Sequence, residues 1–109
     1  MKTIAYIITK ESTSELIEDS LFAPMARGEY GGKVRGIFFV GDGVYHLVKG
    51  SRTTKNIKMI TEKEGTEIYA CKISVKNRKL QNIIVNGVIV SSLKDFYEAM
   101  PDVDHIISF

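Results

Sequence analysis

The sequence has only one cysteine, Cys71, so no disulfide can form within the chain. Thiols stay reduced in the cytosol, and a lone unpaired cysteine fits that compartment. No apolar stretch is long enough to cross a bilayer. The apolar run at residues 2–8 resembles a signal peptide only superficially, because it ends too early and no small-residue cleavage site follows. We therefore expect a soluble, cytoplasmic protein without a membrane segment.

Strong charge and clusters of metal ligands are also missing. The formal net charge is only +2, whereas proteins that bind nucleic acid usually gather basic residues on one face. One cysteine and two distant histidines, His46 and His105, do not have the spacing of metal ligands. No Ser-His-Asp arrangement can be argued either. We expect no metal, no cofactor, and no direct contact with nucleic acid.

What the sequence does contain is typical of one globular domain. The chain has 109 residues, of which 44% are hydrophobic and 26% are charged. A chain of this size is near the common length of a domain and can bury a core without disulfide or metal cross-links. No internal repeat, linker or low-complexity segment interrupts it. We expect residues 1–109 to form a single domain.

Apolar runs alternate with helical patterns along the chain. Runs rich in β-branched and aromatic residues predict strands at 2–8, 34–40, 67–71, 88–90 and 105–109. The first predicted helix begins at a capping box of Ser12 and Glu15 and is kinked or ended by Pro24, which leaves 27–32 as a loop. Helical spacing predicts further helices at 44–48, 54–64, 74–84 and 93–100, with Gly65 as the end of the one at 54–64 and Ser92 with Asp95 as the cap of the last. Strands that alternate with helices indicate βαβ crossovers and a parallel sheet. The predicted fold class is α/β.

One segment of the last third allows two interpretations. Asn86-Gly87, between the apolar residues 83–85 and 88–90, is typical of a tight β-hairpin. Alternatively, a helix at 74–84 ends near these residues and only the second run is a strand. The pattern alone does not separate the two. The alternation of strands and helices elsewhere favours the helix.

Functional groups of an open parallel sheet gather beyond the carboxyl ends of its strands. The predicted loops there are 9–14, 41–43 and 71–74. In the second loop, Gly41 and Gly43 would let the backbone approach a ligand or a neighbouring chain. Asp42 between them has the alternative, and preferred, role of capping the helix that follows.

Cys71 is the residue of this edge with the most distinctive chemistry. It ends the third predicted strand and precedes a helix expected to begin near Ser74. Helix N-termini and nearby cations stabilise a thiolate, and Lys72 and Arg78 are close in sequence. The thiol could therefore act as a nucleophile or carry sulfur as a persulfide. The alternative is that Cys71 is a small buried hydrophobic residue.

The loop at 9–14 is rich in hydroxyl groups, including those of Thr9 and Ser12. Hydroxyls ahead of a helix N-terminus are typical of phosphate-binding loops. This loop has no glycine, however, and helix capping explains its residues adequately. Phosphate or nucleotide binding is the weaker hypothesis.

With these residues identified, the chain resembles the DsrE/DsrF-like family of small sulfur-relay proteins over nearly its whole length. The first similar segment is FFVGDGV at 38–44, where apolar residues run into Asp-Gly-Val. The second is YAC at 69–71 with Arg78 seven residues after the cysteine. The third is NGVIVSSL at 86–93, followed by DHIISF at 104–109. The order and spacing of the segments carry the resemblance.

The resemblance implies a three-layer α/β/α fold with a five-stranded parallel sheet, which decides for the helix and against the hairpin. It also implies a homo-oligomer, a trimer or hexamer, and partner proteins that donate and accept sulfur. In active members, the cysteine that matches Cys71 carries sulfur as a persulfide. Ser74, which could hydrogen-bond the terminal sulfur, stands where some relatives have a second cysteine. Lys79 stands where the family usually has glycine.

Two functions from different classes are consistent with these residues. In the first, the protein is a sulfur carrier or sulfurtransferase that works through Cys71. In the second, it is a non-catalytic oligomeric binding module in which Cys71 is packed. Aromatic residues that a small monomer would leave uncovered, Phe22, Tyr45 and Phe109, favour assembly in either case.

Overall fold

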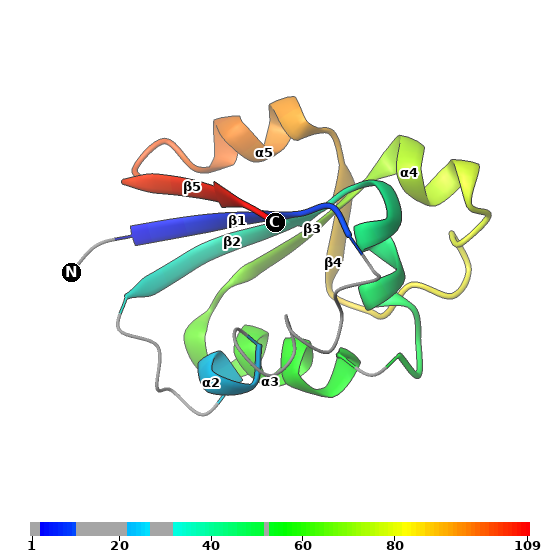
Figure 1. The fold of residues 1–109 in the computed structure, drawn as a ribbon, viewed down its shortest axis with the longest axis horizontal. Helices are drawn as coiled ribbons and strands as arrows, with labels where there is room; N and C mark the ends of the chain where they lie inside the picture. The colour runs from blue at the N-terminus through cyan, green and yellow to red at the C-terminus, as the bar shows by residue number, and fades with distance from the viewer. Residues whose placement is uncertain (1–2, 11–21, 27–31, 52) are drawn as a thin grey trace.

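The computed structural model describes residues 3–10, 22–26, 32–51 and 53–109. A five-stranded sheet runs through it in the order β4-β3-β2-β1-β5, and every pairing is parallel. Its strands are β1 (Thr3–Ile8), β2 (Lys33–Phe39), β3 (Glu67–Cys71), β4 (Val88–Ser91) and β5 (His105–Ser108). All five carboxyl ends therefore lie at one edge of the sheet (Figure 1).

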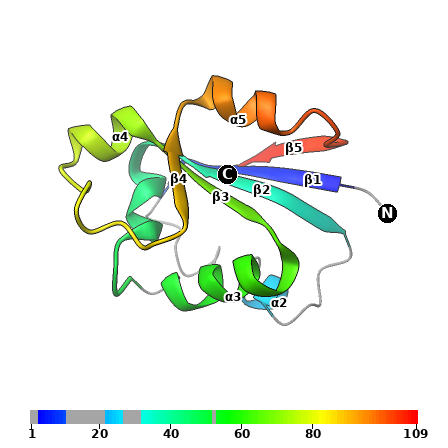
Figure 2. The same ribbon diagram turned by 180° about the vertical axis from the view of Figure 1, so that it is seen from behind.

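Helices lie on both sides of this sheet. The described helices are α2 (Ala23–Ala26), a 3-10 helix η2 (Gly41–Leu47), α3 (Thr54–Glu64), α4 (Lys72–Asn77) and α5 (Leu93–Ala99). Helices α2 and α3 lie on one side of the sheet and α5 on the other, in both views (Figures 1 and 2). The predicted three-layer α/β/α architecture with a parallel sheet is confirmed.

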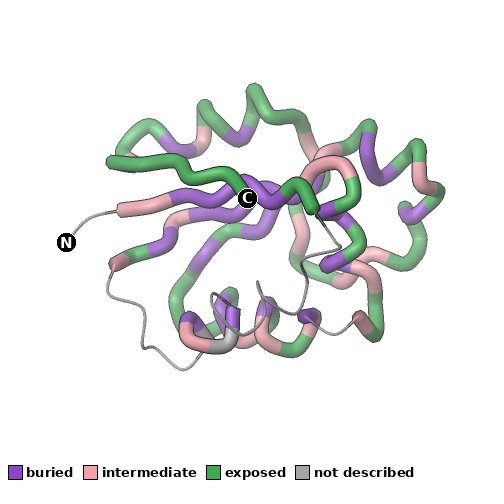
Figure 3. Tube along the Cα trace, in the orientation of Figure 1, coloured by how far each residue is buried: buried purple, intermediate pink, exposed green. Residues whose placement is uncertain are grey.

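The buried core follows the alternation of side chains along the strands. In β1, Tyr6 and Ile8 pack toward the α3 side, whereas Ala5 and Ile7 pack with Phe96 of α5. Strands with both faces covered become continuous apolar runs, which explains the sequence pattern. The edge strand β5 is exposed along its length (Figure 3).

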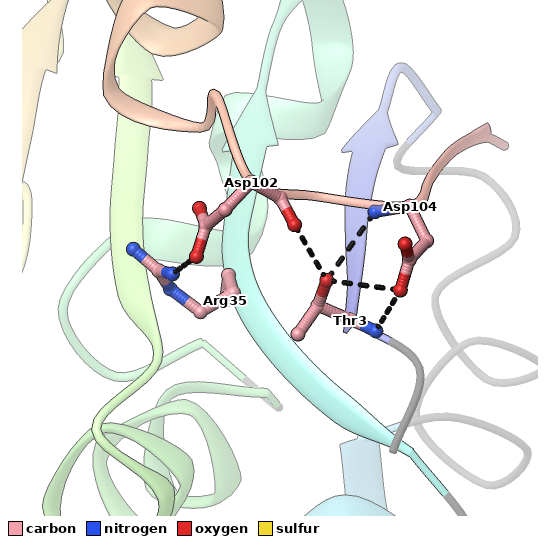
Figure 4. Close-up of polar contacts among 4 residues, drawn as sticks. All are labelled: Thr3, Arg35, Asp102 and Asp104. Atoms are coloured by element: carbon pink, nitrogen blue, oxygen red, sulfur yellow. Dashed lines mark hydrogen bonds and ion pairs between the residues drawn. The ribbon is translucent and has the colours of Figure 1, made fainter.

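Polar contacts fasten the amino-terminal edge of the sheet (Figure 4). The backbone N–H of Thr3 donates to Asp104 Oδ2 at 2.9 Å, and its hydroxyl donates to the carbonyl of Asp102, also at 2.9 Å. Arg35 of β2 forms an ion pair with the Asp102 carboxylate. These contacts hold β1 and β2 to the turn before β5, at the end of the sheet opposite Cys71.

Two of the predicted helices match the structure closely. Helix α3 spans the predicted residues, and Gly65 ends it in a left-handed conformation with φ of 69°. Helix α5 begins at the predicted cap, where Ser92 Oγ accepts a hydrogen bond from the N–H of Asp95 at 3.1 Å. It ends at Ala99, shortly before Pro101.

Of the two effects predicted for Pro24, a kink or an end of the helix, the second does not occur in the described residues. Pro24 is the second residue of α2. Phe22, directly before α2, is π-helical, so the proline lies next to a local irregularity of the helical backbone. The helix predicted to begin at Ser12 lies outside the described residues, except for its last few positions. Residues 27–31 of the predicted loop lie outside them as well.

The predicted helix at 74–84 is also wrong in extent, since α4 begins at Lys72 and ends at Asn77. The N–H of Lys79 donates to Lys76 and that of Leu80 donates to Val75, which is the hydrogen-bond pattern of a Schellman motif. Lys79 takes a left-handed conformation with φ of 56°.

The alternative hairpin at 83–90 does not form. Strand β4 pairs in parallel with β3. Ile84 makes only one isolated antiparallel bridge, to Val48. Asn86-Gly87 is the turn that leads into β4, and Gly87 has a φ of 90°.

Candidate functional site

Cys71 lies at the carboxyl edge of the sheet, where β3 passes directly into α4. It is the last residue of the strand and the N-cap of the helix. Its side chain is partly exposed and packs beside the apolar cluster on the α5 side. Its neighbour β2 continues into η2, and its other neighbour, β4, ends at Ser91. A thiol in this place can be approached from outside the sheet.

Burial raises the pKa of the Cys71 thiol, but hydrogen bonds and a nearby cation outweigh it and leave the pKa below its ordinary value. The hydroxyl of Ser74 hydrogen-bonds the sulfur, as do the backbone N–H groups of Ser74 and Ile73. The Arg78 guanidinium adds a favourable charge. Each of these groups favours the thiolate, which is the reactive form of cysteine.

The Ser74 hydroxyl is oriented by a second contact. The backbone N–H of Gly41 donates to Ser74 Oγ at 2.9 Å, and Ser74 is only 7% exposed. Since the oxygen accepts from Gly41, its own proton is available for the Cys71 sulfur. The loop after β2 thereby helps to set the environment of the thiol at the end of β3.

Arg78 is held in place by Asp42. Its Nε and Nη2 donate to Asp42 Oδ1 at 3.1 and 2.9 Å, and its Nη1 donates to the carbonyl of Ser74 at 3.2 Å. The preferred prediction that Asp42 caps a helix from Val44 is wrong: η2 begins at Gly41, and its N-cap is Val40, without a side-chain cap. The Asp42 carboxylate instead accepts hydrogen bonds from the Arg78 guanidinium.

The two glycines of this loop are required for different reasons. A Cβ atom on Gly43 would lie 2.1 Å from the carbonyl oxygen of Ile8, so no larger residue fits there. Gly41 has a φ of 59°, which other residues rarely adopt. At Gly43 the backbone therefore approaches the end of β1 of the same chain, whereas the predicted approach to a ligand or a neighbouring chain stays a prediction.

The remaining predicted site residues are Lys72, Thr9 and Ser12. Lys72 is exposed at the start of α4, and Arg78 is the cation that acts on the pKa of Cys71. The Thr9 hydroxyl donates to the carbonyl of Phe109 at 2.6 Å. In this arrangement the hydroxyl proton is not available to a ligand. Ser12 lies outside the described residues.

The two histidines have structural surroundings. His46 is buried against the rings of Phe22 and Phe39, and its Nε2 donates to the carbonyl of Lys10 at 3.1 Å. His105 begins β5, at the opposite edge from Cys71. In the described part of the chain, no group of histidine, cysteine and acidic residues could hold a metal ion.

Sequence reasoning missed Ser91. It ends β4 and is the register partner of Cys71 on the neighbouring strand. Its hydroxyl oxygen is buried and has no hydrogen-bond partner among the described residues. The only signal in the sequence was that Ser91 directly follows the strand predicted at 88–90, and all the predicted strands end at this edge.

The fold and the site define a three-layer α/β/α protein with a partly exposed thiol at the carboxyl edge of a parallel sheet. The chain belongs to the DsrE/DsrF-like family, whose model matches residues 2–109. A search of curated proteins found no match.

Three solved structures share this fold. The ychN protein from E. coli is 18% identical, with a TM-score of 0.76 over 100% of both chains. A protein of unknown function from Bacteroides thetaiotaomicron is 18% identical, with a TM-score of 0.74 over 99% of this chain and 95% of that one. Another, from Methanobacterium thermoautotrophicum, is 14% identical, with a TM-score of 0.73 over 98% and 99% of the two chains. These likenesses support the fold alone.

None of the described helices has the length and apolarity needed to cross a membrane. One aromatic residue that was expected to need a partner is covered within the chain, because Phe22 is fully buried. Tyr45 and Phe109 are 39% and 46% exposed, as the sequence predicts.

Proposed function

We propose that this protein is a cytoplasmic sulfur-relay protein, which accepts sulfur on Cys71 as a persulfide and passes it to a partner protein. The observation that carries the proposal is the surroundings of the Cys71 sulfur. It is partly exposed, it accepts hydrogen bonds from Ser74 and Ile73, and its pKa is lowered by these contacts together with Arg78. Membership of the DsrE/DsrF-like family supports the same chemistry.

The transfer requires a donor persulfide and a thiolate acceptor. The Cys71 thiolate attacks the outer sulfur of the donor, a new S–S bond forms on Cys71, and the S–S bond of the donor breaks. The donor leaves as a thiolate, which takes up a proton from solvent. Delivery to the next protein is the same exchange, with Cys71 as the leaving thiolate. Neither step needs an outside oxidant or reductant.

The lack of a second cysteine limits what can follow. Because Cys71 is the only cysteine, a persulfide on it cannot collapse into a disulfide within the same chain. Ser74, at the position where some relatives have a second cysteine, supplies a hydroxyl instead. The sulfur must therefore leave to a thiol of another molecule.

Assembly into a homo-oligomer, a trimer or a hexamer, is part of the proposal. Exposed apolar side chains gather on the two edge strands: Ile89 and Val90 of β4, and Ile106 and Ile107 of β5. Unpaired strand edges that carry such residues favour association. Light scattering at working concentration should give a mass well above that of one chain, and a monomeric mass would refute this part.

Sulfur loading tests the central claim. The reduced protein is incubated with a cysteine desulfurase and isotopically labelled cysteine, and the intact mass is then measured. We expect one added sulfur atom on the wild type and none on Cys71→Ser. A wild type that gains no sulfur, or a serine variant that gains as much, would overturn the proposal.

Thiol reactivity separates this function from a binding module with a packed Cys71. Under native conditions near neutral pH, we expect fast and complete alkylation by iodoacetamide. Slow and incomplete modification of the folded protein would instead favour the packed thiol.

A further inference from the structure

Ser91 lies beside Cys71 at the end of the sheet. The two residues are register partners on β3 and β4, which run in parallel. Register partners on neighbouring strands point their side chains to the same face. Cys71 packs with the cluster that contains Phe96, so this is the face covered by α5. The hydroxyl of Ser91 is therefore the polar group across the strand from the thiol.

The Ser91 hydroxyl is an exception to the rule that buried polar groups are paired. Its oxygen is buried and finds no hydrogen-bond partner among the described residues. Leaving a buried hydroxyl unpaired costs free energy, and such an exception in a folded protein calls for an explanation. Cys71 does not supply one, because no hydrogen bond joins the Ser91 oxygen to any described residue.

We propose that Ser91 is the hydrogen-bond donor to the outer sulfur of a Cys71 persulfide. The inference rests on the sulfur-relay function proposed above. When the Cys71 thiolate takes the outer sulfur of a donor persulfide and the donor leaves as a thiolate, the side chain becomes longer by one S–S bond of about 2.05 Å. The added sulfur brings an acceptor toward a hydroxyl that had none. The inner sulfur keeps its contacts with Ser74 and Ile73.

This contact makes Ser91 specific for the loaded state. The outer sulfur carries the negative charge of an ionised persulfide, and hydrogen bonds to charged groups are stronger than those between neutral groups. Ser91 therefore stabilises the persulfide anion and slows its loss to small nucleophiles. In the unloaded protein, the same hydroxyl contributes nothing favourable to stability.

The test compares the wild type with Ser91→Ala and Ser91→Thr, after sulfur loading of each by a cysteine desulfurase. The persulfide pKa is followed by ultraviolet absorbance across a pH series, and persulfide loss at neutral pH is followed by the thiocyanate formed with cyanide. We expect Ser91→Ala to lose its sulfur about ten-fold faster and to raise the persulfide pKa by about one unit, which is the size of one hydrogen bond to a charge. Ser91→Thr keeps a hydroxyl and should restore most of the difference.

Thermal unfolding distinguishes this role from a purely structural one. Without sulfur, Ser91→Ala should be as stable as the wild type or more stable, because an unpaired buried hydroxyl has been removed. Loading should then stabilise the wild type more than the variant. Ser108→Ala, at the exposed end of β5, is the matched control and should behave as the wild type in every assay.

The outcomes separate the two proposals. If the wild type takes up no sulfur on Cys71, the sulfur-relay function fails and the role of Ser91 fails with it. If the wild type loads, and Ser91→Ala has the same persulfide pKa and the same rate of loss, only the role of Ser91 is overturned. That role is overturned as well if Ser91→Ala destabilises the unloaded and the loaded protein equally.

Discussion

Arg78 donates hydrogen bonds from Nε and Nη2 to a single carboxylate oxygen of Asp42, at 3.1 and 2.9 Å. The pair connects η2, which follows β2, to the end of α4, which follows β3. The third nitrogen of the guanidinium donates to the carbonyl of Ser74. Because all three nitrogens are engaged, the charge of Arg78 is held at the site that contains Cys71.

The first prediction orders three substitutions by their effect on the thiol. The Ser74 hydroxyl is the strongest of the groups that lower the pKa of Cys71, and Arg78 is weaker. Ser74→Ala should therefore raise the pKa of Cys71 most and Arg78→Ala less, whereas Lys72→Ala should leave it nearly unchanged. The measurement is the rate of alkylation by iodoacetamide as a function of pH.

Stability serves as the control for the Arg78 variant. Asp42 is two-thirds exposed, and exposed ion pairs contribute less than about 1 kcal/mol. Arg78→Ala should therefore slow alkylation at neutral pH while changing the free energy of unfolding by less than about 1 kcal/mol. If Lys72→Ala raises the pKa of Cys71 as much as Arg78→Ala does, Arg78 is not the cation that lowers this pKa.

The second prediction concerns the pH dependence of stability. The pKa of Cys71 in the folded protein is lower than the ordinary value of 9.0, so folding favours the thiolate. The resulting stabilisation is complete above the pKa of the unfolded chain and is lost as the pH falls through the folded pKa. Relative to Cys71→Ser, the wild type should gain stability as the pH rises across this window, measured by urea unfolding under reducing conditions. A difference that does not change with pH would contradict a lowered pKa.

The third prediction concerns the contact between η2 and β1. Alanine at Gly43 would place its Cβ 2.1 Å from the Ile8 oxygen and 2.8 Å from the Ile8 carbonyl carbon, both of which are backbone atoms. We expect Gly43→Ala to destabilise the protein by more than about 3 kcal/mol, beyond the usual cost of overpacking. Urea unfolding measures the effect, and the variant should also lose the fast alkylation of Cys71, since η2 carries the Ser74 partner Gly41.

Gly41→Ala is the control for this prediction. Its Cβ would lie 3.6 Å from the nearest atom, the carbonyl oxygen of Thr9, so only the left-handed backbone opposes the change. The expected cost is about 1–2 kcal/mol. If the two variants are equally unstable, the close contact of Gly43 is not the cause.

Local sequence patterns account for the sheet but not for the site. The strands are predictable because each is a short apolar run, and Gly65 and Ser92 mark the end of α3 and the start of α5 by residue type alone. The contact of Asp42 with Arg78 joins residues 36 positions apart, so no local pattern contains it. The pairing of Cys71 with Ser91 depends on strand order and register in the same way.

The early end of α4 was missed for a different physical reason. A Schellman motif normally places glycine at the residue in the left-handed conformation, and that signal is absent because the residue is Lys79. The motif nevertheless forms, with Leu80 buried in the core that also contains Val75. Tertiary packing holds the backbone in a conformation that the side chain disfavours.

The fourth prediction follows from this strain. Lys79 is exposed and has a φ of 56°, a conformation that costs residues other than glycine about 1–2 kcal/mol. Lys79→Gly should therefore stabilise the protein, by about 1 kcal/mol once the greater freedom of glycine in the unfolded chain is subtracted. Urea unfolding should show the gain, and the alkylation rate of Cys71 should not change, because Arg78 keeps its place.

Gly65→Ala supplies the reverse substitution in a matched setting. Gly65 ends α3 with a φ of 69°, and a Cβ there would meet no atom within 4 Å, so the change isolates the backbone conformation. It should destabilise the protein by about 1 kcal/mol. Opposite signs for the two variants would establish that Lys79 carries backbone strain. A loss of stability in Lys79→Gly would instead mean that the lysine side chain stabilises this turn by more than the strain costs.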